Sequence, residues 1–170
     1  MNKNLNLGVI GIDHGHIFDM LDEMLKEGCT CNYFWTEGNP LTLQDFNKKY
    51  PNIKRVDNKS KILENDEIDM ILISSIPKDR AGLSIEALSS GKDVMVDKPG
   101  CITLDQLEDL KRTVKETGKI WSVNFSERFH VAAVAEAEKL VAQDKIGKVK
   151  QTMGTDPHRQ GNYERPNWVY

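Results

Sequence analysis

Short apolar runs alternate with amphipathic segments along most of the chain. The apolar runs have the length and composition of buried strands, which are expected at 5–10, 31–35, 52–56, 70–73, 94–96 and 120–123. Between them apolar residues recur at helical spacing, and helices are expected at 17–25, 41–50, 58–65, 79–90, 103–118 and 131–143. Strand and helix alternate at least five times, so the pattern predicts an α/β fold with a doubly wound, mainly parallel sheet and helices on both faces.

Polar residues at the ends of these segments indicate where helices begin. Asp79 is expected to cap the helix at 79–90, because its carboxylate can accept hydrogen bonds from the first backbone N–H groups. Thr103 and Gln106 have the spacing of a capping box. One more strand is expected at 149–153, after which the chain is polar and has no clear period.

Composition excludes several classes of protein. The 170 residues are 39 % hydrophobic and 29 % charged, which is typical of a globular domain with one sizeable core and a small addition. The net charge is only −3, and the lysines and arginines are scattered and form no basic stripe. No nucleic-acid partner is therefore expected.

Cysteines and apolar runs indicate the compartment. The three cysteines, Cys29, Cys31 and Cys101, are odd in number and lack the spacing of a disulfide framework, so reduced thiols are expected. Residues 1–4 run directly into a strand without the apolar core of a signal peptide, and no apolar run is long enough to span a bilayer. A cytoplasmic protein with no membrane partner is therefore expected.

A glycine turn follows the first expected strand and suits a phosphate-bearing cofactor. The full dinucleotide fingerprint, Gly-x-Gly-x-x-Gly, falls on Gly11, Asp13 and His16, of which only the first is glycine. The carboxylate of Asp13 is expected to crowd and repel a pyrophosphate, while Gly15 could shift the tight turn by one residue. The alternative is that Asp13 caps the first helix.

The same loop contains residue types that bind metals. His14 and His16 stand two residues apart, with Asp13 and Asp19 nearby, but their imidazoles converge only if the turn allows it. The sequence fixes no third ligand, so no metal is expected there. Contact of His14 and His16 with a cofactor or substrate is favoured over a metal, and plain solvation of both histidines is an equal alternative.

Polar residues also follow the second and fourth expected strands. Glu37 can accept hydrogen bonds from both ribose hydroxyls of an adenosine and would repel a 2′-phosphate, which favours NAD over NADP. Ser74, Ser75 and Pro77 are placed to line the same cofactor groove. The alternatives are a solvated glutamate and ordinary turn chemistry.

Asp97, Lys98 and Pro99 give the sharpest signal for chemistry. Lys98 ends a strand with an apolar interior, at the edge where α/β sheets bind ligands. Its ammonium can hydrogen-bond a substrate hydroxyl, or move the proton of that hydroxyl while hydride leaves the carbon. Asp97 can support this charge, and Pro99 stiffens the turn. The alternative is a lysine that extends from the sheet edge into water.

Several segments together resemble one known family. The sequences at 8–11, 87–99, 103–104, 125–129 and 146–149 resemble those of the Gfo/Idh/MocA oxidoreductases. The resemblance implies a Rossmann domain that binds NAD or NADP, followed by a larger sheet domain, and activity on a sugar, inositol or related polyol. Asp97-Lys98-Pro99 matches the family's Glu-Lys-Pro block, which implies that Lys98 is catalytic. Arg128 matches an arginine common after the next strand.

The chain also departs from the pattern of this family. The segment 75–80 replaces a Thr-Pro-Asn sequence and a histidine slightly beyond it. By resemblance, residues 1–125 form the NAD(P)-binding domain, and 126–170 form a connecting helix and the start of a second α+β sheet domain. The rest of that domain would supply most substrate contacts and a catalytic histidine, and homo-oligomers are expected only in a longer form.

Two hypotheses about function remain from the sequence. The first is the cofactor-binding part of an NAD(P)-dependent dehydrogenase acting on a CH–OH group. The second is a non-catalytic regulatory module that binds a nucleotide or a sugar, which the broken glycine fingerprint favours.

Overall fold

A computed structural model gives the structure of the chain and describes residues 4–126, 131–155, 166 and 168. The chain divides into two compact units, Met1–Asn124 and Phe125–Tyr170. The first unit contains the sheet and every candidate site residue apart from Arg128, which lies outside the described residues.

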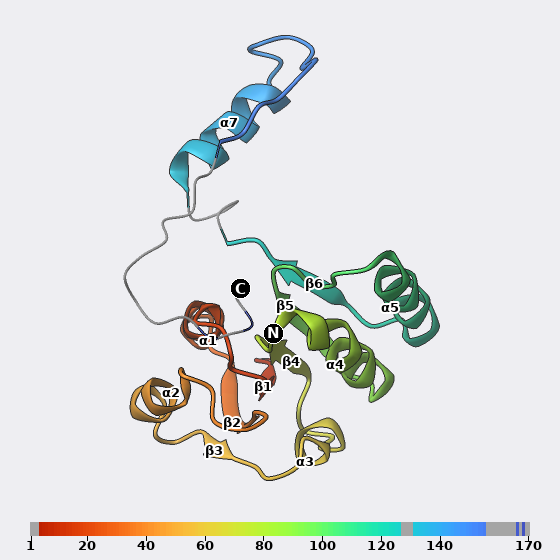
Figure 1. Ribbon diagram of the computed structural model, residues 1–170. Coiled ribbons are helices and arrows are strands. Elements are labelled where there is room, and N and C mark those ends of the chain that lie inside the picture. The colour runs from red at the N-terminus through yellow and green to blue at the C-terminus, as the bar shows by residue number, and fades with distance from the viewer. Residues whose placement is uncertain (1–3, 127–130, 156–165, 167, 169–170) are drawn as a thin grey trace. The chain divides into compact units, whose positions relative to one another are not determined.

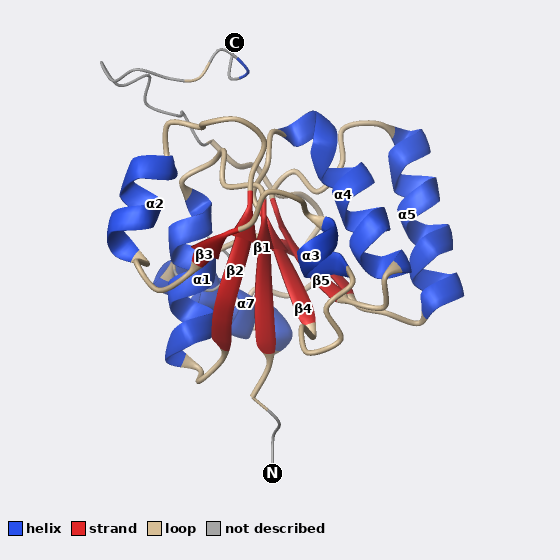
Figure 2. Cartoon of the chain, turned by 90° about the horizontal axis from the view of Figure 1, so that it is seen from below, coloured by secondary structure: helices blue, strands red, loops and turns tan. Residues whose placement is uncertain are grey.

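The first unit is built on a six-stranded parallel sheet (Figure 2). Its strands are β1 (Asn6–Ile10), β2 (Thr30–Trp35), β3 (Lys54–Arg55), β4 (Met70–Ile73), β5 (Asp93–Asp97) and β6 (Trp121–Asn124). They lie in the order β3-β2-β1-β4-β5-β6, so the chain reverses its direction of winding between β1 and β4. This Rossmann-like sheet confirms the predicted fold class and leaves a crevice at the carboxyl ends of the two central strands.

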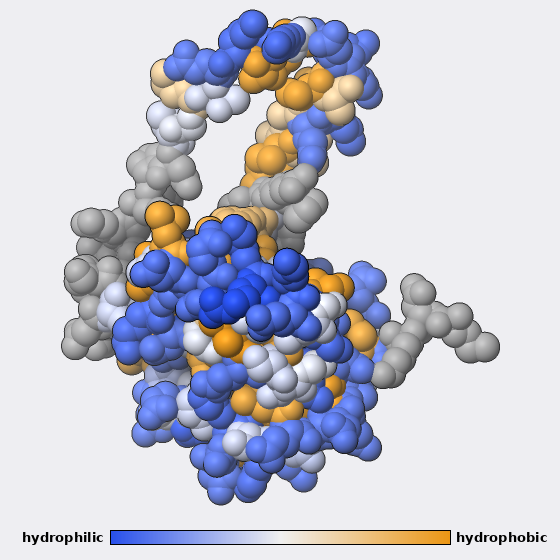
Figure 3. Space-filling view, turned by 90° about the vertical axis from the view of Figure 1, so that its right-hand side faces the viewer, coloured by the Kyte–Doolittle hydropathy of each residue, from blue (hydrophilic) through white to orange (hydrophobic). Residues whose placement is uncertain are grey.

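Helices cover both faces of the sheet. α1 (His16–Lys26) and α2 (Leu43–Lys49) lie on one face, and α3 (Ser60–Leu63), α4 (Pro77–Ser89) and α5 (Leu104–Thr117) lie on the other (Figure 1). The side of the unit that carries α5 is mainly hydrophilic (Figure 3). That helix therefore presents its charged residues to solvent and its apolar stripe to the sheet.

Alternate residues of each central strand enter two separate cores. In β1, Leu7 and Val9 pack with α1 and α2, whereas Ile10 packs with α3 and α4. In β4, Leu72 joins the first core, and Ile71 joins the second. A strand buried on both faces has no polar side, which explains the continuous apolar runs in the sequence.

The starts of α4 and α5 differ in part from the predicted caps. α4 begins at Pro77, not at Asp79, and no side chain caps it. Proline is suited to a first helical position because it lacks the N–H that would be unpaired there. Thr103 caps α5 as predicted, and its hydroxyl accepts from the backbone N–H of Gln106. The amide oxygen of Gln106 accepts from Ile102, one residue earlier than a standard capping box requires.

In the second unit, α7 spans Ala132–Ala142. The strand predicted at 149–153 is wrong, because the structure places these residues in no strand. A segment becomes a strand only beside a partner that takes its backbone hydrogen bonds, and no described segment pairs with this one. Among the described residues, every helix is too short or too polar to cross a lipid bilayer.

Candidate functional site

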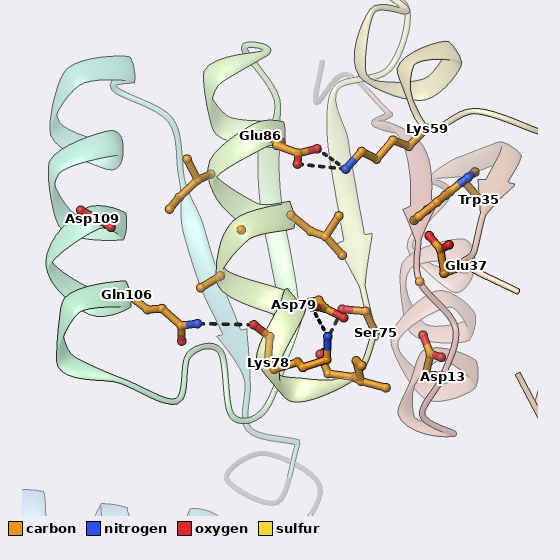
Figure 4. Close-up of a pocket in the computed structure, with 16 residues that line it drawn as sticks. Asp13, Trp35, Glu37, Lys59, Ser75, Lys78, Asp79, Glu86, Gln106 and Asp109 are labelled. Atoms are coloured by element: carbon orange, nitrogen blue, oxygen red, sulfur yellow. Dashed lines mark hydrogen bonds and ion pairs between the residues drawn. The ribbon is translucent and has the colours of Figure 1, made fainter. Parts of the chain in front are cut away.

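A groove of about 740 Å³ lies beside the carboxyl ends of β1, β2 and β4 and along one face of α4 (Figure 4). Four of the predicted cofactor residues line it, and these are Gly11, Asp13, Glu37 and Ser75. The walls combine apolar side chains with charged ones: Trp35, Ala81, Leu83 and Ile85 beside Asp79, Glu86 and Lys59. Such a groove can hold a flat, partly apolar ligand with polar groups at its edges.

Backbone hydrogen bonds of Gly11 join the carboxyl ends of β1, β2 and β4. Its N–H donates to the carbonyl of Trp35 at 2.8 Å, and its carbonyl accepts from the N–H of Ser74 at 3.1 Å. Its φ of +78° is in the left-handed region, and an added Cβ would stand 2.6 Å from the Cβ of Ser75. Only glycine fits this position without displacing backbone.

Gly15 does not take over the role of the tight turn. It is the residue before α1, with φ −63° and ψ −15°, and a Cβ there would meet nothing within 4 Å. The proposed shift of the turn by one residue is therefore wrong, because Gly11 already makes the left-handed bend.

The beginning of α1 has no side-chain cap, so the suggestion that Asp13 caps this helix is also wrong. The carboxylate of Asp13 instead lines the groove, where Figure 4 shows it below Glu37. Burial, together with the negative charges of Asp79 and Glu37, raises the pKa of Asp13 above its usual value.

Glu37 stands near the carboxyl end of β2, two residues beyond Trp35. Its side chain is exposed and lines the groove beside the indole of Trp35 (Figure 4). The carboxylate is thus accessible to a ligand that enters the groove.

A second group of predicted residues surrounds Asp97, which is completely buried. His16 Nδ1 lies 2.7 Å from Asp97 Oδ1, and His14 Nδ1 lies 3.1 Å from Oδ2. The Ser74 hydroxyl lies 3.4 Å from Oδ2. Burial disfavours the charged carboxylate, but hydrogen bonds from both histidines and the charge of Arg80 outweigh it, and the pKa of Asp97 is lowered. The cluster joins the loop after β1 to the end of β5.

Arg80 is the central residue that sequence reasoning did not assign to the site. Its Nη2 pairs with Asp97 Oδ2 at 2.8 Å, and its Nε donates to the carbonyl of Ser75 at 2.8 Å. Its Nη1 donates to the carbonyls of Asp97 at 3.1 Å, Lys98 at 2.5 Å and Pro99 at 3.3 Å. The guanidinium therefore holds the backbone on both sides of Lys98. The available signal was that Arg80 falls in the segment that departs from the family pattern.

Lys98 is half-buried and directly follows β5, at the same edge of the sheet as Gly11. It does not line the groove, nor do His14, His16, Ser74 and Asp97. Gly15 and Pro77, the residues before α1 and at the start of α4, also lie outside the lining. The structure therefore divides the predicted residues between a groove at β1, β2 and β4 and a cluster at the end of β5.

Comparison with known proteins identifies the family. Residues 6–125 match the Gfo/Idh/MocA family, described as an oxidoreductase family with an NAD-binding Rossmann fold. The chain belongs to this family. It is 33 % identical over 87 residues, half of this chain, to the scyllo-inositol 2-dehydrogenase (NAD(+)) of Bacillus subtilis. It is 29 % identical over 155 residues, 88 % of this chain, to the uncharacterized oxidoreductase YdgJ of Escherichia coli.

A solved structure shows the same fold over nearly the whole chain. The crystal structure of a protein described as an oxidoreductase from Erwinia carotovora atroseptica superposes with a TM-score of 0.91 at 33 % identity, over 97 % of this chain. This Gfo/Idh/MocA chain spans 49 % of that protein, and 25 % and 42 % of the two curated relatives.

Proposed function

We propose that the chain is the cofactor-binding part of an NAD(P)-dependent oxidoreductase that acts on a hydroxyl group of a sugar, inositol or related polyol. The observation that carries this proposal is the carboxyl edge of the sheet, where the Gly11 turn, the uncapped start of α1 and Lys98 stand together. The inositol specificity named for the Bacillus relative supports the substrate class.

The residues at this edge fit a dinucleotide. The Gly11 turn allows a diphosphate to approach the backbone closely, and its loop leads into the N-terminus of α1, whose helix dipole favours an anion. Ser75 and Glu37 face the groove that would hold the adenosine half. The carboxylate of Asp13 opposes an anion at this end of the groove.

Glu37 favours NAD as the cofactor over NADP. An exposed carboxylate beyond β2 can accept hydrogen bonds from the two ribose hydroxyls and repels a 2′-phosphate. Replacing Glu37 with Gln is expected to narrow the difference in affinity between the two dinucleotides, which a calorimetric titration of each measures. An unchanged ratio would remove Glu37 from the account of cofactor choice.

Lys98 is the proposed catalytic residue. The bound nicotinamide supplies the hydride acceptor or donor. Lys98 would hydrogen-bond the substrate oxygen and assist the transfer of its proton. Arg80 holds the backbone of Lys98 through its carbonyl, and Asp97 keeps Arg80 in place. The geometry of this lysine thus depends on a buried ion pair.

Turnover of a longer form that includes the second sheet domain tests this function, because that domain would supply most substrate contacts. Inositols and sugars are incubated with NAD⁺ or NADP⁺, and nicotinamide reduction is followed by absorbance. The parent protein is expected to reduce the nicotinamide. Lys98→Ala is expected to lower the rate of this reduction by about a thousandfold and to leave the cofactor affinity unchanged. Cofactor binding without turnover on any of these substrates would instead favour the regulatory module that binds a nucleotide or a sugar.

The wider organisation follows the same proposal. Residues 1–125 are assigned to the cofactor domain, and 126–170 to a connecting helix and the beginning of a second sheet domain. The fraction of the Erwinia structure that the chain spans supports this division. A cytoplasmic location accords with the free cysteines Cys29, Cys31 and Cys101. Homo-oligomers are proposed for a longer form.

A further inference from the structure

The cluster at the end of β5 brings two imidazoles to one carboxylate. His14 Nδ1 and His16 Nδ1 both face Asp97, at 3.1 and 2.7 Å from its two oxygens. One potential ligand atom from each of the three residues lies within 4.8 Å of the other two. The imidazole centroids are 4.1 Å apart and their planes nearly perpendicular, at 87°. One potential ligand atom from each imidazole and one from the carboxylate are therefore close enough to approach a common ion.

The sequence alone left two conditions for a metal site unmet. One was that the turn had to let His14 and His16 converge, and the structure shows that it does. The other was a third ligand, which Asp97 supplies from a strand more than eighty residues away in sequence. Imidazole nitrogen and carboxylate oxygen are a donor set that zinc and other first-row divalent metals accept.

The distances fit such an ion after small movements. Bonds of about 2.1 Å to a tetrahedral zinc place neighbouring ligand atoms about 3.4 Å apart. The present separation of 2.7 Å between His16 Nδ1 and Asp97 Oδ1 is shorter, because a hydrogen bond now joins these two atoms. The side chains of His14 and His16 are 33 % and 28 % exposed, so their rings can turn, each proton can move to Nε2, and water can complete the coordination.

The surroundings hold the buried ligand in a fixed orientation. Arg80, Ser74 and His14 all contact Asp97 Oδ2, whereas His16 contacts Oδ1, so Oδ1 is the less crowded oxygen and the one assigned to a metal. Carboxylate ligands of metals are commonly fixed by hydrogen bonds of this kind. The positive charge of Arg80 opposes a second cation nearby, so we expect an exchangeable ion rather than one that is required for folding.

We propose that His14, His16 and Asp97 form a binding site for a divalent transition-metal ion. The site is separate from the groove, since none of its three ligands lines that groove. Its existence does not depend on dinucleotide binding, and the two can be tested independently.

Co²⁺ and Zn²⁺ are the probes for this site. Metal-free protein without an affinity tag, and without dinucleotide, is titrated with Co²⁺ by visible absorption and with Zn²⁺ by calorimetry. One saturable site is expected, with Co²⁺ bands typical of nitrogen and oxygen ligands. His14→Ala and His16→Ala are each expected to weaken binding by about 100-fold, since loss of a ligand costs at least as much as loss of its supporting hydrogen bond.

Histidines elsewhere in the chain provide the matched controls. His130→Ala and His158→Ala remove the other two imidazoles and are expected to leave the affinity unchanged. The melting temperature of each metal-free variant is compared with that of the parent, because ligand loss at two partly exposed positions should leave the fold intact. The proposal is contradicted if the parent shows no saturable metal binding, or if the parent and both ligand variants bind with equal affinity. The three residues would then only hydrogen-bond to one another.

Discussion

At the scale of residues, the buried ion pair of Arg80 and Asp97 is the main polar feature of the site. Both side chains are at most 1 % exposed, and Arg80 contacts five acceptors on two segments of chain. Removing one member of such a pair lowers the free energy of unfolding by more than the intact pair contributes to it, because the remaining buried charge is then uncompensated. Arg80 therefore controls both stability and the position of Lys98.

Arg80→Met is expected to lower the free energy of unfolding by about 3–5 kcal/mol, because Asp97 then stays buried without its cation. Denaturant unfolding measures this loss. The matched control is Arg112→Met, which removes an exposed partner of Asp109 and should cost no more than about 0.5 kcal/mol. Equal effects of the two substitutions would mean that burial of the Arg80 pair adds nothing.

The position of Asp13 in the groove lining predicts how this residue affects the affinity for a dinucleotide. Asp13→Asn removes the charge that faces the groove and keeps the size of the side chain. NAD⁺ affinity is expected to rise roughly fivefold, which corresponds to about 1 kcal/mol of relieved repulsion at a partly exposed site. Isothermal titration measures it, with Asp45→Asn, an exposed position in the first turn of α2 outside the groove lining, as the control. A weaker affinity would show that the carboxylate itself binds the ligand.

At the scale of elements, the turn between β1 and α1 contains two glycines with opposite requirements. Gly11 is in the left-handed region against the backbone of Ser75, while Gly15 has helical dihedral angles and open space around it. A side chain is therefore strained at the first position and tolerated at the second. This difference separates the part of the turn that shapes the site from the part that only leads into α1.

Gly11→Ala and Gly15→Ala test this difference as a matched pair. Gly11→Ala is expected to cost at least about 1–3 kcal/mol of stability, through backbone strain and the clash with Ser75. Gly15→Ala is expected to be neutral or to stabilise by about 0.4–1 kcal/mol, since alanine restricts the unfolded chain. Thermal and denaturant unfolding of both variants measure these effects, and similar losses at the two positions would contradict the assigned turn geometry.

Elements could be predicted from sequence where local pattern determines them. The apolar run of β4 and the cap at Thr103 depend on neighbouring residues, so the strand and the start of α5 were predicted correctly. Residues 149–153 have apolar residues only at their two ends and pair with no strand among the described residues, and that prediction failed. The contacts of Arg80 and the convergence of His14 on Asp97 depend on how β1, α4 and β5 meet, which no local pattern specifies.

At the scale of the whole molecule, sheet topology accounts for the location of the site. Reversal of the winding direction between β1 and β4 opens the carboxyl edge, and the loops after β1, β2, β4 and β5 all reach it. The family match explains why this edge is expected to hold a nicotinamide dinucleotide. The groove and the cluster around Asp97 are two parts of that same edge.

Titration of the chain with NAD⁺ and with NADP⁺ tests this account most directly. Saturable binding at one site is expected, tighter for NAD⁺, with a rise in melting temperature that grows with dinucleotide concentration. If neither dinucleotide at millimolar concentration releases heat on binding or shifts the melting temperature, the assignment of this edge as a cofactor site is contradicted.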